Sequence, residues 1–283
     1  DEIRINYPNL DIFPNIESAF NKSFDGFILA TPAGTHYELA KRVILNNYDI
    51  LIEKPMALST AHAKELVELA QDRNVNIMVG HVLLFHPAIR KIKSIIESGE
   101  IGDLQYLYSN RLNLGKIRTE ENVFWSLAPH DVAIFQYLTS SNPTSVYAKG
   151  SDFIQKNIPD STITFLEYET GVRAHIFVSW LHPFKEHRLI VIGSEAMISF
   201  EDSLENKPLK LYSKKYDLVA GVPEKIDGPV QSISYENQMP LHEEVRYFIQ
   251  HLGSDKIDIS NGKQGVDVVK VLEMAGKQLL SND

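Results

Sequence analysis

A lysine and a carboxylate stand side by side where the sequence predicts the end of a buried strand. The run DILIEKP places Glu53, Lys54 and Pro55 directly after the apolar residues 50–52. Proline fixes the backbone as the chain leaves the sheet. A lysine in a dry cleft has a lowered pKa and can hydrogen-bond a reacting hydroxyl group. Lys54 is therefore a candidate catalytic residue, and the alternative is a surface lysine that caps the strand.

A histidine at a predicted helix start is the second candidate. In FWSLAPHDVAIF (residues 124–135), Pro129 suits the first turn of a helix, which places His130 and Asp131 near its N-terminus. That position disfavours imidazolium and lowers the pKa of a histidine. A neutral imidazole is what a general base requires. The alternatives are a structural histidine for His130 and a structural N-terminal charge for Asp131.

Two cations in a glycine-containing loop form a third candidate site. The segment NLGKIRTEENVFW (residues 113–125) carries Lys116 and Arg118. Arginine and lysine side chains bind phosphate oxygens, so this pair could hold a diphosphate group. The alternative is a solvated loop without a ligand.

Composition excludes several classes of protein. The 283 residues carry a formal net charge of −9, which argues against a general nucleic-acid backbone binder. No apolar run approaches the roughly 20 residues of a membrane span, so no membrane partner is expected. Cysteine is absent, which excludes disulfides and zinc–cysteine sites and is compatible with the cytoplasm. The histidine spacings do not match H-E-x-x-H, so no metal is predicted, and the G-x-S-x-G motif of hydrolases is absent.

The elements that must position these residues alternate between strand and helix in the N-terminal region. Continuous apolar runs predict buried strands, and helical spacing of apolar residues predicts helices between them. The strands are expected over residues 24–32, 49–52 and 75–79, and the helices over residues 35–46 and from Ser59 or Thr60 onward. Such βαβ units form parallel sheets that bind ligands at the carboxyl ends of their strands. Residues 30–36, 53–55 and 80–88 should therefore meet at one edge.

The pattern changes after about residue 87, where alternating apolar residues predict many strands with few crossover helices. Helices are expected over residues 87–98, 129–138, 241–252 and 265–280, and strands over 104–113, 145–150, 161–168, 172–179, 188–192, 197–200 and 209–212. Residues 202–208 and 220–240 are rich in turn residues and are expected to be mobile. We predict an α/β chain whose residues 1–86 are the remainder of a Rossmann-type doubly wound domain. Residues 87–283 are then an α+β domain for substrate binding and oligomerisation, with a large, mostly antiparallel open sheet.

The glycine fingerprint of dinucleotide-binding domains is missing. No G-x-G-x-x-G motif occurs in the sequence, and the N-terminal region predicts only about half of a doubly wound sheet. The simplest expectation is that a first βαβ unit precedes Asp1 in the natural protein. The alternative is a domain that never bound a dinucleotide.

Five motifs in order carry a resemblance to a known family. They are ATPAGTH (residues 30–36), EKP (53–55), FHPA (85–88), the His130 motif and NGKQGVDVVKVLEMA (261–275). Their order and spacing resemble the glucose–fructose oxidoreductase / inositol dehydrogenase (Gfo/Idh/MocA) family over essentially the whole chain. The resemblance implies a Rossmann domain followed by an open-sheet domain. It also implies NAD as the cofactor, with NADP not excluded, and a homodimer or homotetramer formed through the open sheet.

Residues 113–135 and 173–202 are similar to the nucleotide-sugar branch of that family, the UDP-N-acetylglucosaminuronate 3-dehydrogenases of surface-polysaccharide synthesis. The implied reaction is oxidation of the sugar C3 hydroxyl. The alternatives are a dehydrogenase of a free sugar or cyclic polyol and a non-catalytic dinucleotide-binding regulator.

The same resemblance implies roles for individual residues. Lys54 and His130 would be catalytic. Many family members carry an aspartate four residues before the catalytic histidine, where this chain has Ser126, so the proton-relay partner of His130 is open. The implied cofactor-binding residues are Thr31, Pro32, His36, Glu53, Lys54, Pro55 and His81, and the implied substrate-binding residues are Asn113, Lys116, Arg118, Ser126 and Asp131.

Overall fold

The computed structural model describes residues 2–253 and 256–279. A small parallel sheet in the N-terminal region has the strand order β1-β2-β3. Its strands are β1 (Gly26–Leu29), β2 (Asp49–Glu53) and β3 (Ile77–Gly80), and they alternate with helices α3 (His36–Leu45) and α4 (Thr60–Arg73). Short helices α1 (Glu2–Asn6) and α2 (Ile16–Ala19) precede them, and 3₁₀ turns η1 (Ala33–Thr35) and η2 (Val82–Phe85) follow β1 and β3. The predicted parallel βαβ arrangement is confirmed.

Local signals account for these elements. The first four residues of β2 and all of β3 are buried, as the continuous apolar runs predict. Ser59 caps α4, because its hydroxyl accepts a hydrogen bond from the backbone N–H of His62 at 3.2 Å. The same helix ends at Asn74, whose backbone adopts the left-handed conformation with φ of 53°.

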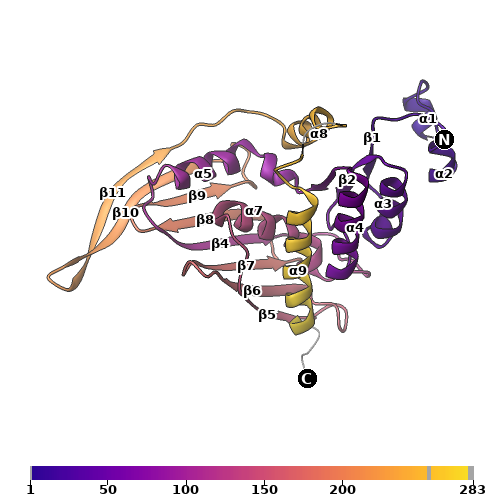
Figure 1. Ribbon diagram of the computed structural model, residues 1–283. Helices are drawn as coiled ribbons and strands as arrows, with labels where there is room; N and C mark the ends of the chain where they lie inside the picture. The colour runs from indigo at the N-terminus through magenta and orange to yellow at the C-terminus, as the bar shows by residue number, and fades with distance from the viewer. Residues whose placement is uncertain (1, 254–255, 280–283) are drawn as a thin grey trace.

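A large sheet forms the second part of the molecule (Figure 1), with the strand order β11-β10-β9-β8-β4-β7-β6-β5. Its neighbouring strands are antiparallel except for the parallel pair β4 and β7. The strands are β4 (Leu104–Leu112), β5 (Ser145–Ser151), β6 (Ser161–Glu167), β7 (Arg173–Ser179), β8 (Glu186–Gly193), β9 (Met197–Glu201), β10 (Leu209–Val219) and β11 (Val222–Ser232). The helices are α5 (Pro87–Glu97), α6 (Val123–Leu127), α7 (Pro129–Thr139), α8 (Pro240–Gln250) and α9 (Gly262–Leu279).

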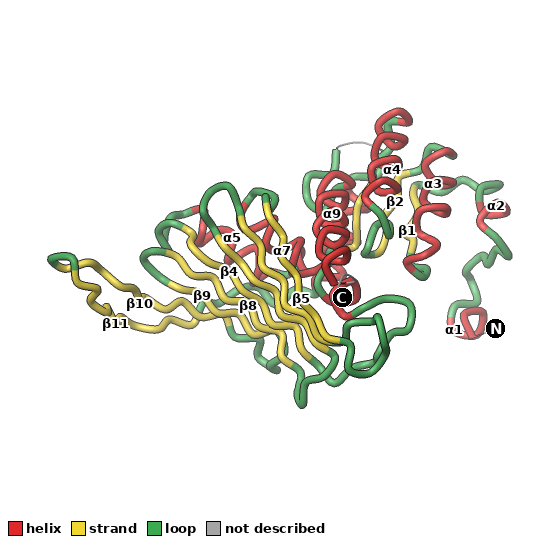
Figure 2. The backbone as a smooth tube through the Cα atoms, turned by 90° about the horizontal axis from the view of Figure 1, so that it is seen from below, coloured by secondary structure: helices red, strands yellow, loops and turns green. Residues whose placement is uncertain are grey.

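The hairpin of β10 and β11 corrects the prediction for residues 220–240. This segment was expected to be turn-rich and mobile, yet Val222–Ser232 pairs with β10 in a long arm that projects beyond the rest of the sheet (Figure 2). Ala220 and Gly221 both have positive φ, which suits the tight turn of a two-residue hairpin. Almost every residue of β11 is exposed, so this strand carries no burial pattern that a sequence could reveal. Helix α6 was also missed, although Asn122 caps it by accepting from Trp125 N at 3.0 Å.

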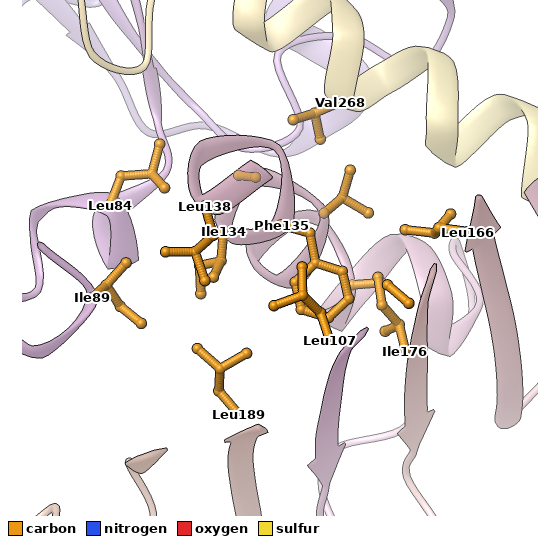
Figure 3. Packing of buried hydrophobic residues seen from close by; sticks show 14 of the residues in the cluster. Leu84, Ile89, Leu107, Ile134, Phe135, Leu138, Leu166, Ile176, Leu189 and Val268 are labelled. Atoms are coloured by element: carbon orange, nitrogen blue, oxygen red, sulfur yellow. The ribbon is translucent and has the colours of Figure 1, made fainter. Parts of the chain in front are cut away.

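Two apolar clusters hold the molecule together. The larger one lies between the large sheet and helices α5 and α7 (Figure 3), where Phe135 packs among Leu107, Leu166 and Ile176. The smaller one fills the space between the parallel sheet and helices α3, α4 and α9. No helix in the described part of the chain is both long enough and apolar enough to cross a membrane.

Helix α9 connects the two parts, because it contacts α4 and β3 of the parallel sheet region as well as α7 and β5. Its residues Val266 and Val269 belong to the smaller cluster, while Val268 and Leu272 belong to the larger one. Just before it, Ser260 Oγ donates to Val79 O at 2.6 Å. The closing helix thus returns to the N-terminal sheet, and a domain boundary at residues 86 and 87 stays a prediction.

Candidate active site

The candidate site is built at the carboxyl edge of the parallel sheet. Because β1, β2 and β3 run in parallel, the segments that follow them meet at one edge. His36 joins two of these segments, since its Nδ1 lies 2.8 Å from Pro55 O and its Nε2 lies 2.8 Å from Thr31 O. A neutral imidazole has one N–H group, so it donates to one of these carbonyl oxygens at a time. Pro32 begins the turn η1 beside them.

Lys54 is held against the helices of the second part of the molecule. Its Nζ donates a hydrogen bond of 2.8 Å to the backbone oxygen of Ser126 in α6. Ser126 lies four residues before His130, which occupies the first turn of α7 after Pro129. The two candidate catalytic residues, predicted separately from the sequence, are therefore brought to one place by a single hydrogen bond across 72 residues of chain.

Burial sets the charge state of both groups. It lowers the pKa of Lys54; the nearby carboxylates of Glu121 and Glu53 oppose this shift, and the charges of Arg111 and Arg118 reinforce it. Burial also lowers the pKa of His130 well below its ordinary value, with further contributions from the charges of Lys54 and Arg111. The imidazole of His130 is therefore neutral near pH 7, and its Nδ1 is buried with no hydrogen-bond partner among the described residues.

A buried ion pair anchors the start of α7. Arg111 in β4 donates to Asp131 through Nε at 2.9 Å and through Nη2 at 3.0 Å. Its Nη1 lies 3.4 Å from His187 Nδ1. Both carboxylate oxygens of Asp131 are thus engaged, and its role in substrate binding stays a prediction. Sequence reasoning missed Arg111, for which the only signal was a charged residue at a position of the predicted strand that alternation assigns to the buried face.

A second carboxylate faces Glu53 from helix α8. Glu53 Oε2 accepts a hydrogen bond of 3.2 Å from its neighbour Lys54 N, and it lies where a Cβ on Gly80 would approach to 3.0 Å. Glu244 is only 1% exposed, and its Oε1 has no partner among the described residues. Burial, reinforced by the charge of Glu53, raises the pKa of Glu244 to about 8. Nothing local in the sequence identified this buried acid.

In the predicted diphosphate-binding loop, one of the two cations interacts electrostatically with the candidate site. Lys116 and Arg118 are both exposed, and of the two it is Arg118 whose charge reaches Lys54. Next to this loop, Glu120, Glu121 and Trp125 line a pocket of about 350 Å³. Acidic side chains at a pocket wall disfavour an anionic ligand there.

The remaining predicted site residues lie at strand ends. Asn113 follows β4, with its backbone N–H bonded to Ser179 O at 3.1 Å. His81 follows β3, is 2% exposed, and has no hydrogen-bond partner on either ring nitrogen among the described residues. The binding roles assigned to both residues stay predictions.

The residues at this edge fit the nicotinamide end of a dinucleotide. The hydroxyl groups of Thr31 and Thr35 lie 2.7 Å apart on an exposed turn directly after β1. Gly80, which has no side chain, leaves room for the carboxylate of Glu53 to lie against β3. Ligands of open parallel sheets bind outside such strand ends. A dinucleotide would be held here by Thr31, Pro32 and the EKP segment.

A parallel sheet with this polar edge, followed by a large open sheet covered by a helix that carries His130, is the arrangement of an NAD(P)-dependent oxidoreductase. The family model described as "Oxidoreductase family, NAD-binding Rossmann fold" matches residues 4–81, and the GFO/IDH/MocA C-terminal domain matches residues 89–199. The chain belongs to the Gfo/Idh/MocA family of oxidoreductases, as its five motifs predict.

Relatives with different substrates resemble the chain to a similar degree. The UDP-N-acetylglucosamine 3-dehydrogenase of Acidithiobacillus ferrooxidans is 25% identical over 256 residues, which cover 89% of this chain and 78% of the relative. The scyllo-inositol 2-dehydrogenase (NAD(+)) of Bacillus subtilis is 28% identical over 202 residues, which cover 68% of this chain and 59% of the relative. The solved structure of GnnA, the A. ferrooxidans UDP-N-acetylglucosamine 3-dehydrogenase, superposes with a TM-score of 0.85 at 22% identity and covers 99% of this chain and 86% of its own.

The buried acid on α8 makes stability depend on pH. The carboxyl of Glu244 ionises near pH 8 in the folded protein and near its ordinary pKa of 4.5 in the unfolded chain. Between these values the unfolded state binds fewer protons, so the free energy of unfolding falls as pH rises, by up to about 1.4 kcal/mol per pH unit. We predict that Glu244→Gln is more stable than the wild type at pH 8 and that this difference shrinks toward pH 5.

Urea unfolding at pH 5, 6, 7 and 8 measures this difference. Glu243→Gln, which removes the neighbouring carboxylate on the same helical turn, is the matched control. Parallel stability curves for Glu244→Gln and the wild type would show instead that Glu244 is ionised in the folded state.

Proposed function

We propose that this protein is an NAD-dependent dehydrogenase that oxidises the C3 hydroxyl of UDP-N-acetylglucosaminuronate in surface-polysaccharide biosynthesis. The observation that carries the proposal is the hydrogen bond from Lys54 Nζ to Ser126 O, which holds a buried amine one helical turn from a neutral histidine. In the oxidation of a secondary alcohol, an amine can stabilise the developing alkoxide and an imidazole can accept the hydroxyl proton. Family membership supplies the redox chemistry.

Each residue has a defined task in this reaction. Lys54 donates a hydrogen bond to the reacting hydroxyl and stabilises the negative charge that develops on its oxygen. His130, neutral because it is buried, takes the hydroxyl proton. When NAD is bound, its nicotinamide ring accepts the hydride that leaves the sugar carbon. His36 holds the Thr31 and Pro55 segments together around the place where that ring would lie.

The sugar itself is inferred from similarity and from one charge. The relative named UDP-N-acetylglucosamine 3-dehydrogenase supports a UDP-sugar. Arg118, whose charge reaches Lys54, is suited to bind either the diphosphate or the carboxylate of a uronate. UDP-N-acetylglucosamine, which lacks that carboxylate, is the closest alternative within this class.

A free cyclic polyol is the second candidate. The acidic side chains of Glu120 and Glu121 at the neighbouring pocket suit a neutral polyol better than a diphosphate. The similarity to scyllo-inositol 2-dehydrogenase points the same way.

Single-turnover oxidation separates these candidates. The protein in its full natural length is mixed with NAD and UDP-N-acetylglucosaminuronate, with UDP-N-acetylglucosamine and myo-inositol in parallel, and NADH absorbance is followed. We expect NADH from the uronate. We also expect Lys54→Ala and His130→Ala to slow its formation by at least about 100-fold, because each removes transition-state stabilisation.

Lys64→Ala, which removes an exposed lysine from α4, is the control and should react at the wild-type rate. Near-normal single-turnover rates in Lys54→Ala or His130→Ala would remove that residue from the mechanism. NADH formed from inositol alone would replace the nucleotide sugar with a polyol.

The loop cations provide an independent test of the diphosphate. We predict that Lys116→Ala combined with Arg118→Ala raises the KM of the UDP-sugar by about 10-fold or more, because charge-assisted hydrogen bonds contribute about 1.5–3 kcal/mol each. Lys64→Ala combined with Lys156→Ala, at exposed lysines on α4 and on the loop after β5, controls for the loss of two positive charges. An unchanged KM would place the diphosphate elsewhere.

We also propose that the protein forms a homodimer or homotetramer through the open face of the large sheet. Helices α5 and α7 pack on one face (Figure 1), and an aromatic row crosses the opposite face. Directly paired residues form this row, namely Tyr147, Phe165, His175 and Tyr108. Tyr147 is 56% exposed and Phe165 is 45% exposed. Apolar surface of this kind marks interaction sites.

Phe165→Asp is predicted to dissociate the assembly, because it places a charge at the centre of the aromatic row. The mass in solution, measured by light scattering after gel filtration, reports the change. Phe153→Asp, at a 72% exposed phenylalanine in the loop after β5, should leave the mass unaltered. An unaltered mass for Phe165→Asp would place the interface on another surface.

The predicted cytoplasmic location is consistent with this function and stays a prediction.

A further inference from the structure

A second polar pocket lies behind the candidate site, between helices α7 and α9. It has a volume of about 350 Å³, and His81, Gln136, Ser141 and Asp267 are among the residues that line it. Three of these side chains carry buried polar atoms without a hydrogen-bond partner among the described residues: both ring nitrogens of His81, Gln136 Nε2 and Ser141 Oγ. This pocket shares no lining residue with the one at Glu121 and Trp125.

Such a pocket is built to hold water. A buried polar atom without a partner costs about 1–3 kcal/mol, so it is normally satisfied by ordered water. Water occupies about 30 Å³ per molecule in the liquid, so the pocket has room for several molecules in contact with one another. The side chains of Gln136, Ser141 and Asp267 supply donors and acceptors along its length.

The pocket begins next to the proposed base. His130, Ala133 and Tyr137 follow one another at helical spacing along α7, and the latter two line the pocket. His81 lies between the pocket and the site, because it lines the pocket together with Ala133 and directly follows Gly80, which pairs with Glu53. The Nδ1 of His130 is buried and unpartnered, as are both nitrogens of His81.

Two of the groups closest to His130 in the sequence are engaged by cations. The residue four positions earlier is Ser126, whose backbone oxygen accepts from Lys54. The adjacent Asp131 has both carboxylate oxygens bonded to Arg111. Of the two histidines near His130, His187 has its Nδ1 3.4 Å from Arg111 Nη1, whereas both ring nitrogens of His81 lack a partner within the described part of the chain.

We propose that the proton taken up by His130 leaves the site through His81 into the water of this pocket. This inference rests on the proposed function, because it needs a substrate whose hydroxyl proton is removed. His81 acts through His130 and is a positioning residue for the proton, without contact to the reacting atoms.

The step balances with NAD as the oxidant. The C–H bond of the substrate breaks and its electron pair leaves as hydride to NAD. The O–H bond breaks as an N–H bond forms on the His130 nitrogen that faces the substrate. The N–H bond at the buried Nδ1 then breaks, and a bridging water passes this proton to His81. One ring nitrogen of His81 gains a proton as the other releases one to the pocket. After the product leaves, each imidazole exchanges protons with water, losing one from the newly protonated nitrogen and gaining one at the other, so that its first tautomer returns.

The charges around His81 disfavour its protonated form, so that a proton that reaches this ring moves on to the water of the pocket. Lys54 faces it from the end of β2 and His130 from α7, while Asp267 of α9 and Lys93 of α5 line the pocket beyond. Burial and the charge of Lys54 lower the pKa of His81 to about 3. A proton therefore does not remain on this ring near pH 7.

Two substitutions test the route in the full-length protein with NAD. His81→Phe removes both ring nitrogens, and His81→Asn keeps a polar group that does not relay protons. Hydride transfer is followed by NADH absorbance and proton release by a pH-indicator dye in weak buffer. We expect both variants to lower kcat by about 10-fold or more, to leave the KM of the substrate near its wild-type value, and to recover rate when imidazole is added.

His86→Asn is the matched control in the same segment. His86 caps α5 by accepting from Ala88 N at 3.1 Å, and asparagine retains such a cap. We expect this control to react at the wild-type rate without imidazole. Wild-type rates in both His81 variants, or losses that imidazole does not reverse, would overturn the relay.

A measurement without turnover keeps the two proposals separate. A high-resolution crystal structure of the wild-type protein with NAD should show ordered water that joins His130 Nδ1 to His81 and continues into the pocket. A dry contact at that position would overturn the relay whatever the substrate is. If none of the three substrates is oxidised, the proposed function fails, and the crystal structure still decides the inference.

Discussion

The hydrogen bond from Lys54 Nζ to Ser126 O is the constraint on which the site depends. It joins the end of a parallel strand to the helices that precede β5, and so brings an amine from one part of the chain to a histidine in the other. An amine loses hydration when it is buried, and this bond compensates part of that cost. The same burial that makes the bond necessary lowers the pKa of Lys54 and of His130. Position and charge state therefore have one physical origin.

The buried ion pair of Arg111 and Asp131 also helps to position His130. Removal of one partner of such a pair costs about 3–5 kcal/mol, because the other is left charged in an apolar environment. The pair holds the first turn of α7 against β4, and with it the ring of His130. Its positive member also keeps His130 neutral. An interaction that fixes the helix thus also supplies part of the electrostatics of the base.

Much of the fold could be predicted from the sequence because its signals are local. Continuous apolar runs reveal β2 and β3, and Pro129 reveals the start of α7. The arm strand β11 could not be predicted, since almost all of its residues face solvent and no periodicity distinguishes them from a loop. Arg111 and Glu244 were missed for a related reason. Their importance comes from partners distant in sequence, and a carboxylate on α8 looks like any surface acid until its neighbours are known.

Helix α9 makes the packing of the N-terminal sheet depend on residues from the C-terminal part of the chain. The smaller apolar cluster takes Val266 and Val269 from this helix, and Ser260 bonds to β3. The N-terminal sheet is therefore incomplete as a folding unit until the chain has been synthesised almost to its end. During synthesis, the apolar surface that α9 will cover therefore stays exposed to solvent while more than half of the chain is added. Completion of the parallel sheet and closure of the pocket lined by His81 and Asp267 then coincide, because helix α9 contributes residues to both.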